Sequence, residues 1–112
     1  AALTADPRHY RALFNAGVAL LLRAAGEEGE DARALLERAE ARFLAAEGQR
    51  PGSAAYNMAC VEARLGDEAA CLRWLEKAQR HGLLPDRKHI ETDPDLEAVR
   101  GAVWFEPFLE SL

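Results

Sequence analysis

The sequence predicts an all-α protein, and three observations support this prediction. Apolar residues recur at intervals of three and four along several stretches, which is the spacing of one face of an α-helix. Alanine is abundant, β-branched residues are few and aromatic residues make up only 7% of the chain, so the composition favours helices over strands. Glycine and proline divide the periodic stretches into segments of helical length.

The 112 residues are predicted to form one domain, because this length supports a single core. The formal net charge of −5 is opposite in sign to that of most proteins that bind nucleic acids or anionic membranes, so we expect neither partner. No apolar run approaches the roughly 20 residues that cross a bilayer. A basic start followed by an apolar stretch is also absent, and no signal peptide is expected in this sequence.

The first helix is expected to run from Pro7 to about Ala25, with Asp6 as its N-cap. Its apolar positions are Tyr10, Leu13, Phe14, Gly17, Val18, Leu21 and Ala24. Two glycines among acidic residues at 26–30 interrupt the pattern, and Asp31 is positioned to cap a second helix. The buried stripe of that helix is expected to comprise Leu35, Leu36, Ala39, Phe43, Leu44 and Ala46. Residues 48–52, which include a proline, end it.

The third and fourth helices form a predicted hairpin from Ala55 to Ala78, joined at Gly66-Asp67. Small side chains on both helices allow a close approach, and larger apolar residues lie on facing stripes. The fourth helix is expected to end near His81, where basic residues suit the negative end of the helix dipole.

The C-terminal part is predicted to be less regular, with one helical turn near residues 87–91. Thr92-Asp93-Pro94-Asp95 is a strong helix start signal, and a short helix to about Gly101 is expected after it. The apolar terminus contains Val103, Trp104, Phe105, Phe108, Leu109 and Leu112. We expect this terminus, helical from about Glu106, to pack back onto the hairpin as a lid. The alternative is an exposed apolar patch that marks an interface.

No residue pattern indicates catalysis, a cofactor or a metal site. Cys60 and Cys71 are expected to be buried free thiols, which favours a cytoplasmic location, and no CxxC or HxxxH spacing supports zinc. His9, His81 and His89 lie on different segments, without the paired base and orienting group that a nucleophile needs. We therefore expect a protein that is not an enzyme.

The two helical pairs share an internal pattern. Asn15-Ala16-Gly17 matches Asn57-Met58-Ala59. The spacings of four, three and five in Ala39, Phe43, Ala46 and Pro51 are repeated in Cys71, Leu75, Ala78 and Leu83. This pattern resembles the tetratricopeptide repeat, a helix-turn-helix unit of 34 residues. The match is closest from Ala55 to Ala78, and the first unit departs from the family by a longer turn.

The resemblance implies an α-solenoid of two stacked antiparallel repeats, at about residues 8–51 and 52–83, and a C-terminal cap at about 84–112. Residues 92–96, Arg100 and residues 105–109 are similar to the segment that closes such arrays in many bacterial proteins. Residues 2–7 look like the end of a preceding repeat. About three repeats are usually needed for stability, so two repeats imply a truncated array, a compensating lid or self-association.

The resemblance also implies a scaffold that recognises a protein or peptide partner in a concave groove lined by the first helix of each repeat. On this chain the predicted partner-binding residues are Arg11, Phe14, Asn15, Val18, Ser53, Tyr56, Asn57, Cys60 and Arg64, with Leu21 beside them. The competing interpretation is that Phe14, Val18 and Tyr56 belong to the core, and that Asn15 and Asn57 satisfy backbone groups between helices. The alternative function is a structural or regulatory module of a larger enzyme, or a self-associating scaffold.

Overall fold

A computed structural model describes residues 7–112 of the chain. The expected Asp6 cap and the similarity of residues 2–7 to the end of a repeat lie outside the described residues. Every regular element from residue 7 onward is helical. The elements are α1 (Pro7–Ala24), α2 (Gly29–Gln49), α3 (Ala55–Leu65), α4 (Glu68–Arg80), α5 (Arg87–Thr92), the 3-10 helix η1 (Pro94–Val99) and α6 (Phe105–Glu110).

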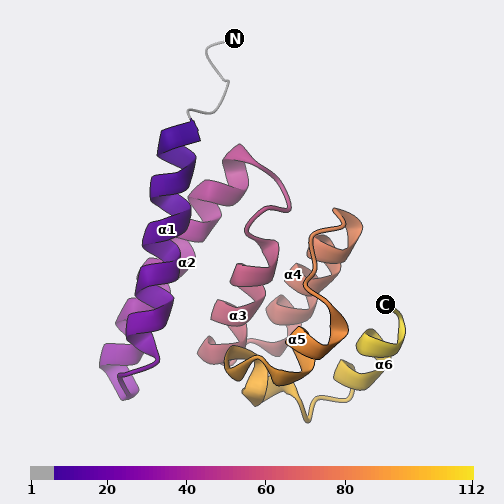
Figure 1. Ribbon diagram of the computed structural model, residues 1–112. Coiled ribbons are helices and arrows are strands. Elements are labelled where there is room, and N and C mark those ends of the chain that lie inside the picture. The colour runs from indigo at the N-terminus through magenta and orange to yellow at the C-terminus, as the bar shows by residue number, and fades with distance from the viewer. Residues whose placement is uncertain (1–6) are drawn as a thin grey trace.

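The helices are arranged as two antiparallel pairs followed by a C-terminal segment (Figure 1). Helix α1 runs along α2, and α3 runs along α4. The second pair packs on the first through α2 and α3, while η1 packs against α3. The predicted all-α fold with helix-pair packing is therefore confirmed.

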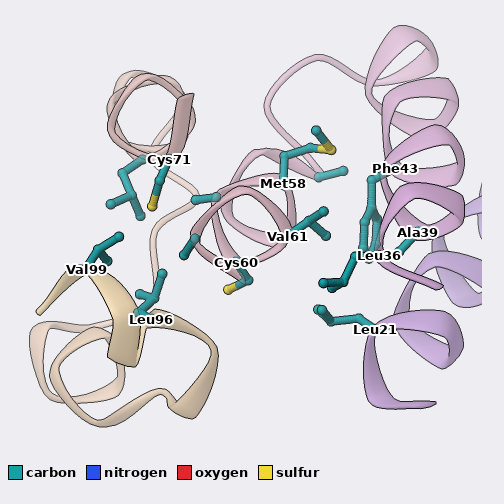
Figure 2. Close-up of a cluster of buried hydrophobic side chains, with 14 of the residues drawn as sticks. Leu21, Leu36, Ala39, Phe43, Met58, Cys60, Val61, Cys71, Leu96 and Val99 are labelled. Atoms are coloured by element: carbon teal, nitrogen blue, oxygen red, sulfur yellow. The ribbon is translucent and has the colours of Figure 1, made fainter. Parts of the chain in front are cut away.

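Helix α3 is the centre of the molecule, because apolar side chains cover it from two sides (Figure 2). Phe43 of α2 lies on the side of Met58 and Val61, and Leu96 of η1 lies on the other side of the helix with Cys71 of α4. Burial of seven of the eleven α3 residues accounts for the mostly apolar sequence of this helix.

The close approach of α1 to α2 depends on Gly17. A Cβ atom at this position would lie 2.7 Å from Cε1 of Phe43, which is inside van der Waals contact. The Phe43 ring, itself fully buried, occupies the space that any larger residue at 17 would need. The glycine that interrupts the apolar stripe is thus a packing residue.

The turn between α3 and α4 agrees with the prediction. Gly66 has a φ of +89°, a left-handed conformation that glycine adopts without strain, and the Asp67 carboxylate accepts a 3.0 Å hydrogen bond from the Ala70 amide. The start of α2 differs, because α2 begins at Gly29 and Glu28 stands at the N-cap. Asp31 therefore lies inside the first turn, where its charge still suits the positive end of the helix.

One expectation about apolar side chains was wrong, and a second was right only in part. Leu44 is 46% exposed, since it follows the fully buried Phe43 by one position and points about 100° away from it around the helix. The apolar terminus is only partly a lid. Phe105, Phe108 and Leu109 are buried in the common core, and Trp104 is half-buried, whereas Val103 is 93% exposed in the turn before α6.

The linker between the two helix pairs is held by Glu47, whose side chain is 5% exposed. Its carboxylate accepts hydrogen bonds from the amides of Gly52 (2.5 Å) and Ala54 (2.9 Å), and it forms a 2.8 Å ion pair with Lys77 of α4. Burial acts to raise the pKa of Glu47, but these three donors outweigh burial and the pKa lies below its usual value. One carboxylate thus joins α2, the linker and α4.

Candidate functional site

The predicted partner-binding residues fall into two groups in the structure. On α1, Arg11 and Asn15 are exposed, while Phe14 and Val18 are half-buried. The second group comes from α3 and the residues before it: Ser53, Tyr56, Asn57 and Arg64 are half-buried, and Cys60 is buried.

The stripe of α3 that contains Tyr56 and Cys60 is not open, because residues of the C-terminal segment contact it. The Tyr56 hydroxyl donates a 2.7 Å hydrogen bond to Oδ2 of Asp93, and Cys60 Sγ lies 3.8 Å from the same oxygen. Nε2 of His89 is 3.4 Å from this oxygen, and its ring packs edge-on against Tyr56 at 5.8 Å. These contacts therefore come from α5 and the α5–η1 junction.

Arg64 connects three elements at the end of α3. Its Nη1 donates a 3.2 Å hydrogen bond to the carbonyl of Leu21 near the end of α1 and lies 3.6 Å from Oδ1 of Asp95 in η1. Two hollows of about 360 and 370 Å³ meet at its side chain, one lined by the start of α2 and the other by η1. Arg64 is therefore a structural bridge, with a fifth of its side chain exposed.

The electrostatics around Asp93 favour neutral side chains. Burial, with the negative charge of Asp93 and other neighbours, raises the pKa of both the Tyr56 hydroxyl and the Cys60 thiol. Burial also raises the pKa of Asp95, with Asp93 adding to this effect and Arg64 opposing it. Tyr56 and Cys60 are thus hydrogen-bond donors to Asp93 at neutral pH.

Phe14 belongs partly to the core, as the competing interpretation expects. Its ring contacts Phe43 edge-on at 5.7 Å and stacks with Tyr10 at 6.0 Å. Asn15 and Asn57 do not follow the competing interpretation, because neither side chain forms a hydrogen bond with another described residue. The two amides are thus available to groups outside this part of the chain.

Sequence reasoning missed Asp93, Asp95 and His89 as neighbours of α3. Asp93 was assigned only a helix start, and its carboxylate does accept a 3.0 Å hydrogen bond from the Asp95 amide as a cap. The spacing of four between His89 and Asp93, which places both on one side of a helical turn, was the one available signal.

Comparison with known proteins gives one partial similarity. The chain is similar to a chloroplastic protein of Arabidopsis thaliana, with 38% identity over 79 aligned positions that cover 66% of this chain and 23% of that protein. The chain thus spans less than a quarter of the curated relative that it matches. No family model matches the chain, and no solved structure matches it significantly. Among residues 7–112, no helix combines the length and apolar character needed to cross a bilayer.

Proposed function

We propose that this chain is a tetratricopeptide-type interaction module that binds an extended segment of a protein or peptide without catalysing a reaction. Two antiparallel pairs joined in sequence, a glycine turn at Gly66 and the repeated spacings of the two pairs support this proposal. The division into repeats at about residues 51 and 83, and the cytoplasmic location, stay predictions.

The proposed binding surface is the part of the predicted groove that the C-terminal segment leaves uncovered. On α1, Arg11, Asn15 and Val18 follow one another at spacings of four and three, so they share one face of the helix. Asn57 on α3 is half-buried without a hydrogen-bond partner among the described residues. This unpaired amide carries the proposal, because a side chain that binds a peptide backbone needs free donors and acceptors.

The chemistry of this surface defines the ligand class. The amides of Asn15 and Asn57 suit a peptide backbone, Arg11 suits a carboxylate, and Val18 suits a small apolar side chain. Tyr56, Cys60 and Arg64 act behind this surface, because they are already bonded to other parts of the chain. We therefore expect an acidic, partly apolar peptide in extended conformation.

The proposal is tested by selecting peptides from a displayed library of unstructured sequences and measuring their dissociation constants by fluorescence anisotropy. Arg11→Ala and Asn57→Ala are each expected to weaken a selected peptide about tenfold, which corresponds to about 1.4 kcal/mol. The matched control is Arg38→Ala, an exposed arginine of α2 outside the surface. Peptides that bind both groove variants as tightly as the unmodified chain, or no selectable peptide at all, would contradict the proposal.

A second candidate function is self-association or docking within a larger protein, and two exposed leucines of the first helix pair favour it. Leu22 of α1 is 70% exposed and Leu44 of α2 is 46% exposed, on the pair that packs against the rest of the described chain mainly through α2. Light scattering separates this function from an open groove. A dimer that persists on dilution and is disrupted by Leu22→Glu supports self-association, whereas a monomer at all concentrations contradicts self-association and leaves docking within a larger protein as the second candidate.

A further inference from the structure

Three side chains with metal-binding atoms converge where the C-terminal segment meets α3, and a fourth, His89, lies beside one of them. The sulfur of Cys60 and one carboxylate oxygen each of Asp93 and Asp95 lie within 4.8 Å of one another. His89, one helical turn before Asp93, places Nε2 3.4 Å from Oδ2 of that residue. The four residues come from α3, α5 and the start of η1, so only the folded chain brings them together.

We propose that this cluster is a binding site for a divalent transition metal of the zinc type, with Cys60, Asp93, Asp95 and His89 as ligands. Metal binding at this cluster does not require that the chain bind a peptide, so this proposal is independent of the proposed function. It also departs from the sequence-based expectation of no metal site, which considered only sequence spacing between cysteines and histidines.

The donor set favours zinc over calcium or magnesium. A thiolate and an imidazole are ligands that zinc and cobalt accept, whereas calcium and magnesium require oxygen atoms almost exclusively. With metal–ligand bonds of about 2.0–2.3 Å, a tetrahedral site has ligand-to-ligand distances of about 3.3–3.6 Å. The distances from Asp93 Oδ2 are 3.8 Å to Cys60 Sγ and 3.4 Å to His89 Nε2, close to this value. His89 lies outside the group of three whose donor atoms are within 4.8 Å of one another, so its side chain must turn toward Cys60 and Asp95 to complete the site.

The cluster combines a buried ligand, which is held in place, with an exposed ligand, which can move as the metal enters. Cys60 is 3% exposed and is fixed by the surrounding core, while the His89 side chain is 56% exposed and free to turn toward the metal. Asp93 and Asp95 are half-buried between them. The site therefore has a rigid inner wall and an adjustable outer ligand that faces solvent, which gives the ion a path of entry.

Neighbouring groups orient the carboxylate at the centre of the cluster. The Tyr56 hydroxyl donates to Oδ2 of Asp93 at 2.7 Å, and the Asp95 amide donates to Oδ1 at 3.0 Å. Such outer-shell hydrogen bonds commonly fix the direction of a ligating carboxylate. Both donors therefore hold the Asp93 carboxylate in a defined orientation toward Cys60 and His89.

One of the two arginines beside the cluster already pairs with a ligand carboxylate, whereas the other does not. Arg64 lies 3.6 Å from Asp95, and Arg100 donates to the backbone carbonyl of Asp93 rather than to its carboxylate. On binding, the Cys60 thiol loses its proton to solvent and the resulting thiolate donates an electron pair to the metal, while the His89 imidazole and the two carboxylates each donate a lone pair. Binding should therefore weaken as the pH falls.

The site is tested with Co²⁺ alone, because a cobalt–thiolate bond gives a charge-transfer absorption in the near ultraviolet. The full chain, reduced with a phosphine, is titrated with Co²⁺ and the bound cobalt is then displaced by Zn²⁺. The band is expected in the unmodified chain and in Cys71→Ala, the matched control for the other buried cysteine, and it should be absent in Cys60→Ala. Asp95→Asn and His89→Ala should each raise the Co²⁺ dissociation constant at least tenfold.

Far-ultraviolet circular dichroism checks that each variant is folded. If Cys60→Ala does not fold, the exposed His89→Ala and the Asp95→Asn variant decide the question, since neither removes a core side chain. No thiolate band in the unmodified chain, a band of full intensity in Cys60→Ala, or unchanged Co²⁺ affinity in both His89→Ala and Asp95→Asn would overturn the proposal.

Discussion

The hydroxyl of Tyr56 is 2.7 Å from the carboxylate of Asp93, although 37 residues separate the two in the sequence. The hydrogen bond joins the central helix α3 to the start of η1, and the same carboxylate caps η1 through the Asp95 amide. Asp93 therefore fixes both the beginning of η1 and its position on the hairpin.

Replacing Tyr56 by phenylalanine should remove this connection while keeping the ring. A hydrogen bond to a charged acceptor contributes about 1.5–3 kcal/mol, so the free energy of unfolding should fall by about that amount. Urea unfolding followed by tryptophan fluorescence measures the change. Tyr10→Phe is the control, because the Tyr10 hydroxyl has no hydrogen-bond partner among the described residues, and an equal loss in both variants would contradict the assigned role.

Glu47→Gln should destabilise the chain by about 2–3 kcal/mol, because it leaves Lys77 without its charged partner and weakens the bonds to the linker amides. The control is Glu37→Gln. Glu37 forms an ion pair with Arg33 in which both side chains are exposed, so this pair should contribute less than about 0.5 kcal/mol. Comparable effects of the two substitutions in urea would be evidence against a specific role for Glu47.

The effect of Glu47 should also depend on pH in a defined direction. Its folded pKa lies below the ordinary value of 4.5, so the unfolded chain takes up a proton first on acidification. The stabilising contribution is therefore complete above pH 4.5 and is lost as the pH falls through the folded pKa. The gap between Glu47→Gln and the unmodified chain should narrow in acid, and a gap that is constant down to the acid limit would exclude the ion pair as its cause.

Glu62 should behave in the opposite way. Burial, with a hydrogen bond and the negative charge of Glu40, raises its pKa to about 8. Between the ordinary value of 4.5 and this value the folded chain holds a proton that the unfolded chain has released, so stability falls as the pH rises. Glu62→Gln should therefore be more stable than the unmodified chain at pH 8, with little difference near pH 4.

Thermal unfolding at the two pH values measures this change in stability. The matched control is Glu76→Gln on the exposed face of α4, which should leave the pH profile unchanged. If Glu62→Gln lowers the melting temperature at pH 8, the buried carboxyl is stabilising and the expected sign is wrong.

Two glycine substitutions should have opposite signs. Gly17→Ala places a methyl group 2.7 Å from the Phe43 ring and should cost about 1–3 kcal/mol, since the core around this ring is fully packed. Gly48→Ala adds a methyl group with no heavy atom within 4 Å and should stabilise α2 by up to about 1 kcal/mol. Urea midpoints that move in the same direction would contradict the packing assigned to Gly17.

The sequence was sufficient for the four long helices and for several of their ends. Periodic apolar residues indicate which face of a helix is buried. Gly66 and Asp67 indicate where α3 ends and α4 begins, because capping interactions join residues that are close in the sequence. The same periodicity misplaced Leu44, because a position next to a buried residue can lie just beyond the edge of the stripe. The burial of Cys60 and Cys71 as free thiols was predicted and is confirmed.

The candidate site was less accessible to sequence reasoning. Tyr56 and Cys60 were identified from the family resemblance, but their contacts with Asp93 and His89 are polar and join segments more than 30 residues apart. Neither periodicity nor capping rules carry information about such pairs. The aromatic terminus was expected to pack onto the hairpin, and the polar contacts of Tyr56 are made by the short segment before that terminus.

Glu47 stabilises the junction between the two helix pairs. Its carboxylate bonds to the linker amides of Gly52 and Ala54 and to the ammonium group of Lys77, so it holds α2 in a defined position relative to α4. A ligand that spans both pairs would then meet a surface whose halves are already aligned, and little of its binding free energy would be spent on domain-like bending. Selectivity for one ligand over another would then depend on shape complementarity to a preformed surface, and not on a conformational change around the ligand.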